Sequence, residues 1–254
     1  GSTALDSITT GDYNVALGDE AGTAITEGAK NVTIGFRAGK LISTGIQNVA
    51  VGSYSLDANT TGQENIAIGN SALGSNTTAS NNTAVGTKAL YANTTGTSNA
   101  AFGYYALNLN TTGDANSAVG YQALDSNTTG TRNSAVGFQT LQANTTGSYN
   151  AASGATAMYS NTTGSGNTAF GFQALNTNTT GSDNVAIGHL VLDANTTAND
   201  NVGIGNRALG ANTTGSGNCA MGNDAMYINT TGSNNVAIGN NALYANTTAD
   251  NNVA

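Results

Sequence analysis

The chain has little charge and lacks two residue types altogether. Its 254 residues include no Pro and no Trp, one Cys and one His, and 8% of them are charged, whereas ordinary globular proteins carry about 25% charged residues. With six Lys and Arg residues and a net charge of -8, a basic nucleic-acid-binding surface is not expected. One Cys excludes an internal disulfide. No run of about 18 apolar residues is present, so we expect no membrane span in this segment.

What the chain does contain is a 17-residue unit that recurs without insertion or deletion. A strict short period with one Gly-bounded apolar patch is the signature of a solenoid. We therefore predict an all-β fold, a parallel β-solenoid (β-roll) of about fifteen 17-residue coils. Stacked coils lie about 4.8 Å apart, so columns of like charge would repel, which explains the scarcity of charge. The opening residue is Asn in every copy: Asn14, Asn31, Asn48, Asn65, Asn82, Asn99, Asn116, Asn133, Asn150, Asn167, Asn184, Asn201, Asn218, Asn235 and Asn252.

The repeat predicts one array that covers residues 1–254, without a domain boundary. Residues 1–47 form less regular coils, in which Ile25 and Ile42 stand where Asn stands later. Residues 48–254 follow a regular pattern, Asn-x-Ala-x-Gly, then Ala-Leu, then Asn-Thr-Thr-Gly. Both ends of the chain fall in mid-coil, and solenoids normally have capping segments. We interpret the chain as a segment of a longer fibre, or as a subunit that continues end to end.

We number the places of the repeat from 1, the opening Asn, to 17. A coil of this length has room for two strands of four or five residues and two turns. Place 4 is apolar in almost every coil, as in Ile68 and Phe102, and we predict that it forms the core ladder, with place 2 on the same face. Place 3, on the opposite face, is almost uniformly Ala, which indicates a second backbone close by, across the coil or from another chain. Leu at place 9, as in Leu90, is large enough to fill the coil interior.

Twelve coils read Asn-Thr-Thr at places 12 to 14, which matches the N-glycosylation acceptor. The alternative is a ladder of Asn side chains that hydrogen-bond along the stack, and it explains the strict register better. The Thr pairs also suggest ice binding as a function, because flat Thr rows on solenoids order water. Adjacent Thr residues point to opposite faces, however, so only one row is exposed. The residues of the glycosylation site or Asn ladder are Asn59, Asn76, Asn93, Asn110, Asn127, Asn144, Asn161, Asn178, Asn195, Asn212, Asn229 and Asn246.

Aromatic residues gather at place 6, where Tyr104, Tyr121, Phe138 and Phe172 form a candidate ligand-facing stripe. A stacked stripe of this kind either binds the faces of sugars or packs across coils and between chains. The only histidine, His189, has no second His and no paired Cys, whereas a metal site needs three or four convergent ligands.

Catalysis is not expected from this sequence either. Asp57, Asp125 and Asp193 stand four coils apart, about 20 Å, so they do not form the paired carboxylates of a glycosidase. No Gly-x-Ser-x-Gly elbow surrounds a Ser. We predict no catalytic, cofactor-binding or metal-binding residue, no cofactor, and a protein that is not an enzyme.

The motif Asn-x-Ala-Ile/Val-Gly resembles the head repeat of trimeric autotransporter adhesins, the YadA-like left-handed β-roll. It is seen at residues 65–69, 184–188 and 235–239. The form linked by Asn-Thr-Thr-Gly is also similar to repeats of phage tail fibres and of large bacterial surface proteins. The resemblance covers essentially the whole chain and implies a left-handed roll and a homotrimer of parallel chains. The 17-residue period is longer than the usual head repeat and adds the Thr-Thr segment.

The sequence thus leads to a structural hypothesis. We expect a fibre or filament segment, adhesin-like or tail-fibre-like, that mediates surface projection, adhesion or assembly. Its location would be extracellular, on a cell surface or a virion fibre. The expected partners are copies of the chain, in a homotrimer or an end-to-end filament, and a host-surface glycan or protein. The alternative is a glycan-binding or ice-binding β-solenoid that acts through its aromatic or Thr ladders.

Overall fold

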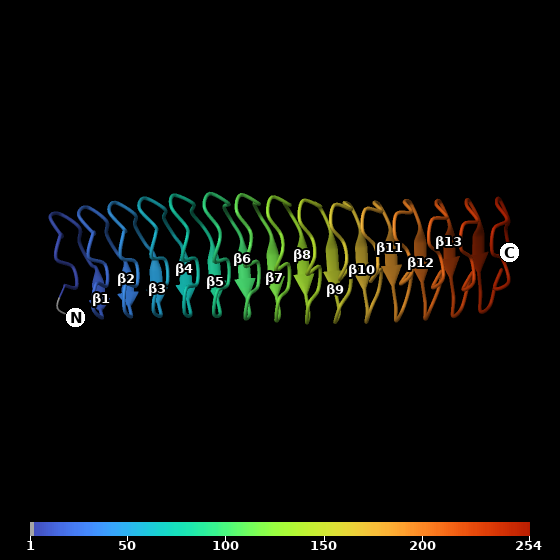
Figure 1. Cartoon of the computed structure of the whole chain (residues 1–254), viewed down its shortest axis with the longest axis horizontal. Helices are drawn as coiled ribbons and strands as arrows, with labels where there is room; N and C mark the ends of the chain where they lie inside the picture. Colours follow the sequence, from blue (N-terminus) through green and yellow to red (C-terminus); the bar gives the residue numbers. More distant parts are fainter. Residues whose placement is uncertain (1–2) are drawn as a thin grey trace. The chain divides into compact units, whose positions relative to one another are not determined.

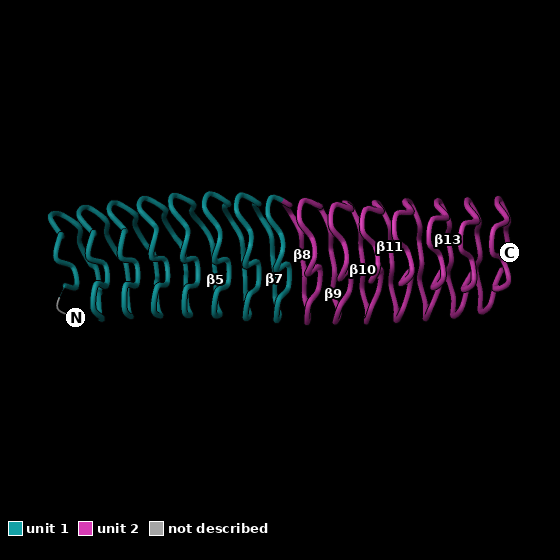
Figure 2. Tube along the Cα trace, in the orientation of Figure 1, with its two compact units in different colours: residues 1–129 teal, residues 130–254 magenta. Residues whose placement is uncertain are grey.

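The computed structural model describes residues 3–254, which fall into two compact units, Gly1–Thr129 and Gly130–Ala254 (Figure 2). Among the described residues every strand belongs to a parallel sheet and no helix is present. Each coil contributes one short strand, drawn as an arrow in Figure 1. The predicted all-β parallel β-solenoid is therefore confirmed in each unit. The last opening Asn, Asn252, is followed only by an isolated bridge at Val253, so the strands number fourteen.

The first unit contains seven strands of three residues, and each pairs in parallel with the next. The register is one period, so that Val49 lies beside Ile66 and Val51 beside Ile68. The strands are β1 (Val15–Leu17), β2 (Val32–Ile34), β3 (Val49–Val51), β4 (Ile66–Ile68), β5 (Thr83–Val85), β6 (Ala100–Phe102) and β7 (Ser117–Val119).

The second unit repeats this organisation with seven further strands. Val185 lies beside Val202 and Ile187 beside Ile204, again one period apart. The strands are β8 (Ser134–Val136), β9 (Ala151–Ser153), β10 (Thr168–Phe170), β11 (Val185–Ile187), β12 (Val202–Ile204), β13 (Cys219–Met221) and β14 (Val236–Ile238).

From the coil at Asn48 onward, the interior is filled by a small residue at place 3, almost always Ala, and by the large residue at place 9. In the two coils before it, place 9 is Gly, and Ile25 and Ile42 are the large buried residues. Ala67 and Ala101 are fully buried, and so are Leu73 and Leu90, as predicted for the Leu column. The prediction that place 4 forms the core ladder is wrong. Phe102 is 42% exposed, because places 2 and 4 point out of the sheet while place 3 points in. The coil is too thin to enclose two large side chains, so only Ala fits opposite Leu.

The turns are held in left-handed backbone conformations, and the prediction of two strands per coil is wrong for this reason. Non-glycine residues at places 7, 9 and 17 have positive φ, for example Lys88 at 54°, Leu90 at 54° and Glu64 at 55°. Such residues cost roughly 1–2 kcal/mol each. Hydrogen bonds between coils offset this cost, since the amide of Leu90 donates to the carbonyl of Ala106 at 2.9 Å. The part of each coil around places 7 to 9 therefore forms a turn that is hydrogen-bonded to the same turn in the neighbouring coil.

Glycine at place 5 ends each strand and permits the next coil to approach. Gly69 has a φ of 133°, a region that side chains rarely adopt, and a Cβ there would lie 2.6 Å from the carbonyl oxygen of Gly86. Place 5 is therefore closed to larger residues on two grounds, backbone conformation and contact with the neighbouring coil.

Candidate functional site

The outward sheet face, defined as places 2 and 4 of the strands, is an uncharged and largely apolar surface. None of the first or third residues of the fourteen strands is charged, and most are Val, Ile or Phe. These side chains are only partly covered; Ile187, for example, is 40% exposed. The free Cys219 also lies on this face, half-buried. Alternating exposure along each strand creates the surface, because Ala at place 3 takes the interior position.

The twelve Asn residues of the Asn-Thr-Thr segments lie inside the coils and form hydrogen-bonded columns within each unit. The Nδ2 atom of Asn76 donates to the Oδ1 of Asn59 at 2.9 Å and to the carbonyl of Ala79 at 3.0 Å. Eleven of the twelve are fully buried, and Asn246 is half-buried. N-glycosylation attaches its sugar at this same amide nitrogen, so modification would require the ladder to open and would leave buried polar groups without partners.

A second Asn ladder runs through the opening residue of the repeat, and sequence reasoning did not foresee its bonds. The Oδ1 atom of Asn31 accepts from the backbone amide of Asn48 at 3.0 Å, and the Nδ2 of Asn48 donates to the carbonyl of Gly62 at 2.9 Å. Each such Asn therefore joins the start of a strand to the Thr-Thr-Gly turn and to the next coil. The feature of the sequence that could have predicted this ladder is the uniform Asn at place 1.

The two Thr residues of each turn have different environments. At place 13 the hydroxyl is bonded within the stack, as when Thr60 Oγ1 donates to the carbonyl of Thr77 at 3.1 Å. At place 14 the side chain is exposed and its hydroxyl makes no hydrogen bond within the described residues. We call these residues the exposed Thr row: Thr10, Thr44, Thr61, Thr78, Thr95, Thr112 and Thr129 in the first unit, where Glu27 interrupts the row, and Thr146, Thr163, Thr180, Thr197, Thr214, Thr231 and Thr248 in the second.

The four residues of the predicted aromatic stripe are divided between the units. In the first unit Tyr104 and Tyr121 stack, with ring centroids 5.4 Å apart and an interplanar angle of 7°. In the second unit Phe172 stacks on His189 at 5.5 Å, and Phe138 is half-exposed two coils before Phe172. The rings of Tyr104, Tyr121 and Phe172 thus stack on neighbouring rings.

Tyr104 also contacts its sequence neighbour Tyr105, with ring centroids 4.3 Å apart. A hydrogen bond with Tyr105 raises the pKa of the Tyr104 hydroxyl. The stack in the first unit therefore extends over Tyr105, Tyr104 and Tyr121. Tyr105 was not part of the predicted stripe. It lies at place 7, where a left-handed backbone conformation brings its ring beside that of Tyr104, and the sequence does not reveal that conformation.

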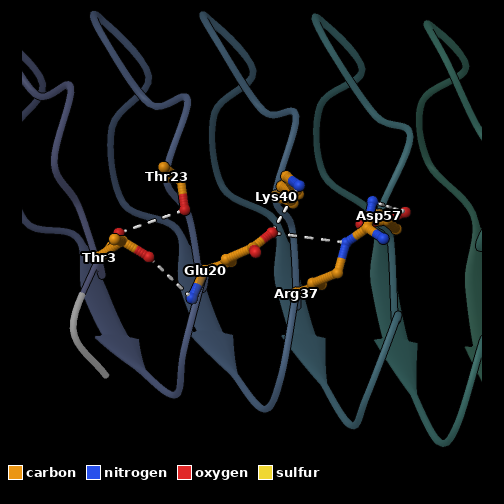
Figure 3. Close-up of polar contacts among 6 residues, drawn as sticks. All are labelled: Thr3, Glu20, Thr23, Arg37, Lys40 and Asp57. Carbon is orange, nitrogen blue, oxygen red and sulfur yellow. Dashed lines mark hydrogen bonds and ion pairs between the residues drawn. The ribbon is translucent and has the colours of Figure 1, made fainter.

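Charged residues form one network in the first coils, shown in Figure 3. Glu20 pairs with Lys40 at 2.5 Å and with Arg37 at 3.7 Å, and Arg37 pairs with Asp57 at 3.3 Å. The backbone amide of Glu20 also donates to the Thr3 hydroxyl at 3.2 Å. Burial raises the pKa of Asp57 even though Arg37 acts to lower it. The two cations and two carboxylates balance in charge and join three successive coils, although Asp57 Oδ1 is buried without a hydrogen-bond partner.

The described part of the chain shows neither a metal-binding cluster nor a pocket. Residues 3–254 contain no group of three or more His, Cys, Asp or Glu residues placed to hold a metal ion, and no pocket. Burial raises the pKa of Asp193, and backbone hydrogen bonds and the nearby His189 offset this only in part. The described residues contain no helix long and apolar enough to cross a membrane.

Comparison with known proteins leaves the family open. No family model matches this chain, and no curated protein matches its sequence. The candidate surfaces therefore rest on the geometry of the solenoid alone.

Proposed function

We propose that this chain is a structural segment of an extracellular fibre whose solenoid assembles with copies of itself through the outward sheet face. The single observation that supports this is the uncharged, half-exposed surface of Val, Ile and Phe that runs along the strands of both units. In one unit, seven strands at about 4.8 Å spacing and three residues at about 3.3 Å give a face of about 330 Å² in projection. This is the size of the largest apolar patch on a typical monomer, and such patches are often functional.

A second copy of the chain is the partner that fits this face best. Only a solenoid with the same rise presents side chains at the same spacing, coil after coil. Two identical charged faces would repel, but this face carries no charge at any strand position. Three such faces that converge on a threefold axis form a closed homo-oligomer. The homotrimer implied by the resemblance to YadA-like heads is the assembly we propose, and projection or adhesion at a cell or virion surface is its role.

Assembly is tested with two matched double variants, measured by light scattering and electron microscopy. Ile68→Glu with Ile187→Glu places one carboxylate in each unit on the outward sheet face. Thr61→Glu with Thr180→Glu adds the same charge in the exposed Thr row. We expect the wild type and the Thr variant to have the mass of three chains, and the Ile variant to dissociate, because a buried unpaired charge is costly. A monomeric wild type, or equal assembly of both variants, would refute the proposal.

The exposed Thr row supports a second candidate function, the ordering of water at ice. Its hydroxyls have no protein partner among the described residues and recur once per coil, about 4.8 Å apart. Thr180→Lys interrupts the row at a central position in the second unit. We expect the wild type to show thermal hysteresis and the variant to lose most of it. Hysteresis that is absent in the wild type, or unchanged in the variant, counts against this function.

A further inference from the structure

Four of the six basic side chains lie over tyrosine rings, and they differ in whether a carboxylate neutralises them. Arg37 lies over Tyr54 and is paired with Glu20 and Asp57. Arg207 lies over the Tyr227 ring at 4.9 Å and is paired with Asp224 at 2.8 Å. Arg132 lies over Tyr149 and donates to its hydroxyl at 2.6 Å. The fourth, Lys88, has no ion pair among residues 3–254.

Lys88 is held between two aromatic rings by the turn of its coil. Its Nζ atom lies 5.5 Å from the ring centroid of Tyr91 and 5.4 Å from that of Tyr105. The φ of 54° at Lys88 directs the side chain toward place 10 of its own coil and place 7 of the next. An ammonium group has three N–H donors, and none of them has a protein acceptor in the described part of the chain. The donors are thus available to a ligand.

The rings around Lys88 form a continuous shallow array over three consecutive coils. Tyr91 packs against Gly74, where an added Cβ would lie 3.1 Å from the ring, so the ring lies low over the preceding coil. Tyr105 continues into the stack with Tyr104 and Tyr121. Tyr91 is 39% exposed and Tyr104 is 47% exposed. With no enclosing pocket in residues 3–254, the array suits an extended ligand rather than a small molecule.

The charge around this array favours a ligand group that is negative. Places 6, 7 and 10 of the coil that contains Lys88, and of the coils before and after it, hold no carboxylate. The next acids along these columns are Asp57, which is already paired with Arg37, and Asp125, each two coils away, about 10 Å in the stacking direction. That is one Debye length at 0.1 M salt. Salt therefore weakens the repulsion between these carboxylates and a negative ligand at Lys88.

We propose that Lys88, together with Tyr91, Tyr105 and Tyr104, binds a carboxylated sugar unit of an acidic polysaccharide. The ammonium pairs with the sugar carboxylate through a charge-assisted hydrogen bond. Exposed tyrosine surface contacts the C–H groups of the sugar ring, since aromatic side chains offer a large apolar area with a polar end. Every residue of the site belongs to one chain, so the site does not rest on assembly. If the fibre is an oligomer, the copies of the site raise the affinity by multivalency.

Binding is measured on the full chain by calorimetric titration with oligogalacturonate, and with its methyl ester as the neutral counterpart. We expect binding of oligogalacturonate and about tenfold weaker binding for Lys88→Met, because one charged hydrogen bond is lost. Lys40→Met is the matched control, since it removes the same charge from a lysine that is paired with Glu20, and we expect it to bind like the wild type. Lys88→Arg should retain most of the affinity.

Tyr91→Leu tests the aromatic part of the site, and we expect it to weaken oligogalacturonate binding while circular dichroism and thermal unfolding stay unchanged. Equal affinity for the methyl ester would overturn the role of the carboxylate. Equal affinity for poly-glutamate would overturn the sugar assignment. Unchanged binding by Lys88→Met, or no oligogalacturonate binding by the wild type, would overturn the site itself. None of these results depends on the assembly state.

Discussion

Removal of one side chain from the inner Asn ladder should destabilise the first unit severely. Asn76 is fully buried, and its side chain takes part in three hydrogen bonds. It donates to Asn59 at 2.9 Å and to the carbonyl of Ala79 at 3.0 Å, and its Oδ1 accepts from Asn93 at 2.9 Å. Asn76→Ala deletes all three bonds and leaves two buried acceptors and one donor with fewer partners. At about 1 kcal/mol net for each bond, plus the penalty for buried unsatisfied groups, we expect a loss of about 3–5 kcal/mol.

The loss is measured by equilibrium urea unfolding followed by circular dichroism, with Thr78→Ala as the control. Thr78 lies two residues away in the exposed Thr row, so its truncation should change the free energy of unfolding by no more than about 0.5 kcal/mol. Because long repeat arrays do not always unfold in one step, coincident transitions by two probes are required before the free energies are compared. A loss under about 1 kcal/mol for Asn76→Ala would refute the view that the ladder holds the coils together.

Three further changes test the interior, the close approach of coils and the burial of a carboxylate. Leu90→Ala empties the coil interior and should cost about 2–5 kcal/mol in urea unfolding; a smaller cost would mean that the coil collapses around the gap. Gly69→Ala should also lower the unfolding temperature, because the new Cβ would press on Gly86; an unchanged temperature would contradict this. Burial raises the pKa of Asp125 above its ordinary value of 3.8. The free energy of unfolding therefore falls as the pH rises through that raised pKa. Asp125→Asn should increase stability at pH 7 and weaken this pH dependence. An unaltered pH profile would show that burial of Asp125 does not cause the pH dependence.

The sequence predicts the fold because its period repeats without error. The strict recurrence of Asn-x-Ala-x-Gly is enough to locate each strand and its register, and the structure has strands at those positions, as at Ile66–Ile68. The number of strands per coil was not predictable from length alone, because Leu90 and Lys88 adopt left-handed conformations that favour turns. Local propensity gives no warning of such conformations, since the bonds that offset them come from neighbouring coils.

The inward and outward faces of the strand were assigned the wrong way round for a physical reason. Hydrophobicity favours Ile68 over Ala67 as the core residue, but the coil interior is limited in volume and Leu73 already fills it. The apolar residues at places 2 and 4 therefore face outward. The residues of the surface that we propose for assembly were predicted from the sequence to be core residues. The only larger residue at place 3 is Thr33, and its coil has Gly39 instead of Leu at place 9.

The candidate binding site was only partly accessible from sequence. Tyr104 and Tyr121 were selected because they share a place in adjacent coils, and they stack at 5.4 Å. Lys88 and Tyr91 were not selected, because their contact joins places 7 and 10 through a turn whose geometry the sequence does not reveal. The signal available in the sequence was that Lys88 is the only basic residue between Lys40 and Arg132.

The native Cys219 provides the most direct test of the central claim, that copies of the chain meet through the outward sheet face. It is the only cysteine of the chain and lies at place 2 of β13, on that face. A nitroxide attached to Cys219 and measured by electron paramagnetic resonance should show strong dipolar coupling between copies, which dilution with unlabelled chain removes. Assembled protein whose labels show no coupling would place the contact elsewhere on the solenoid and contradict the account.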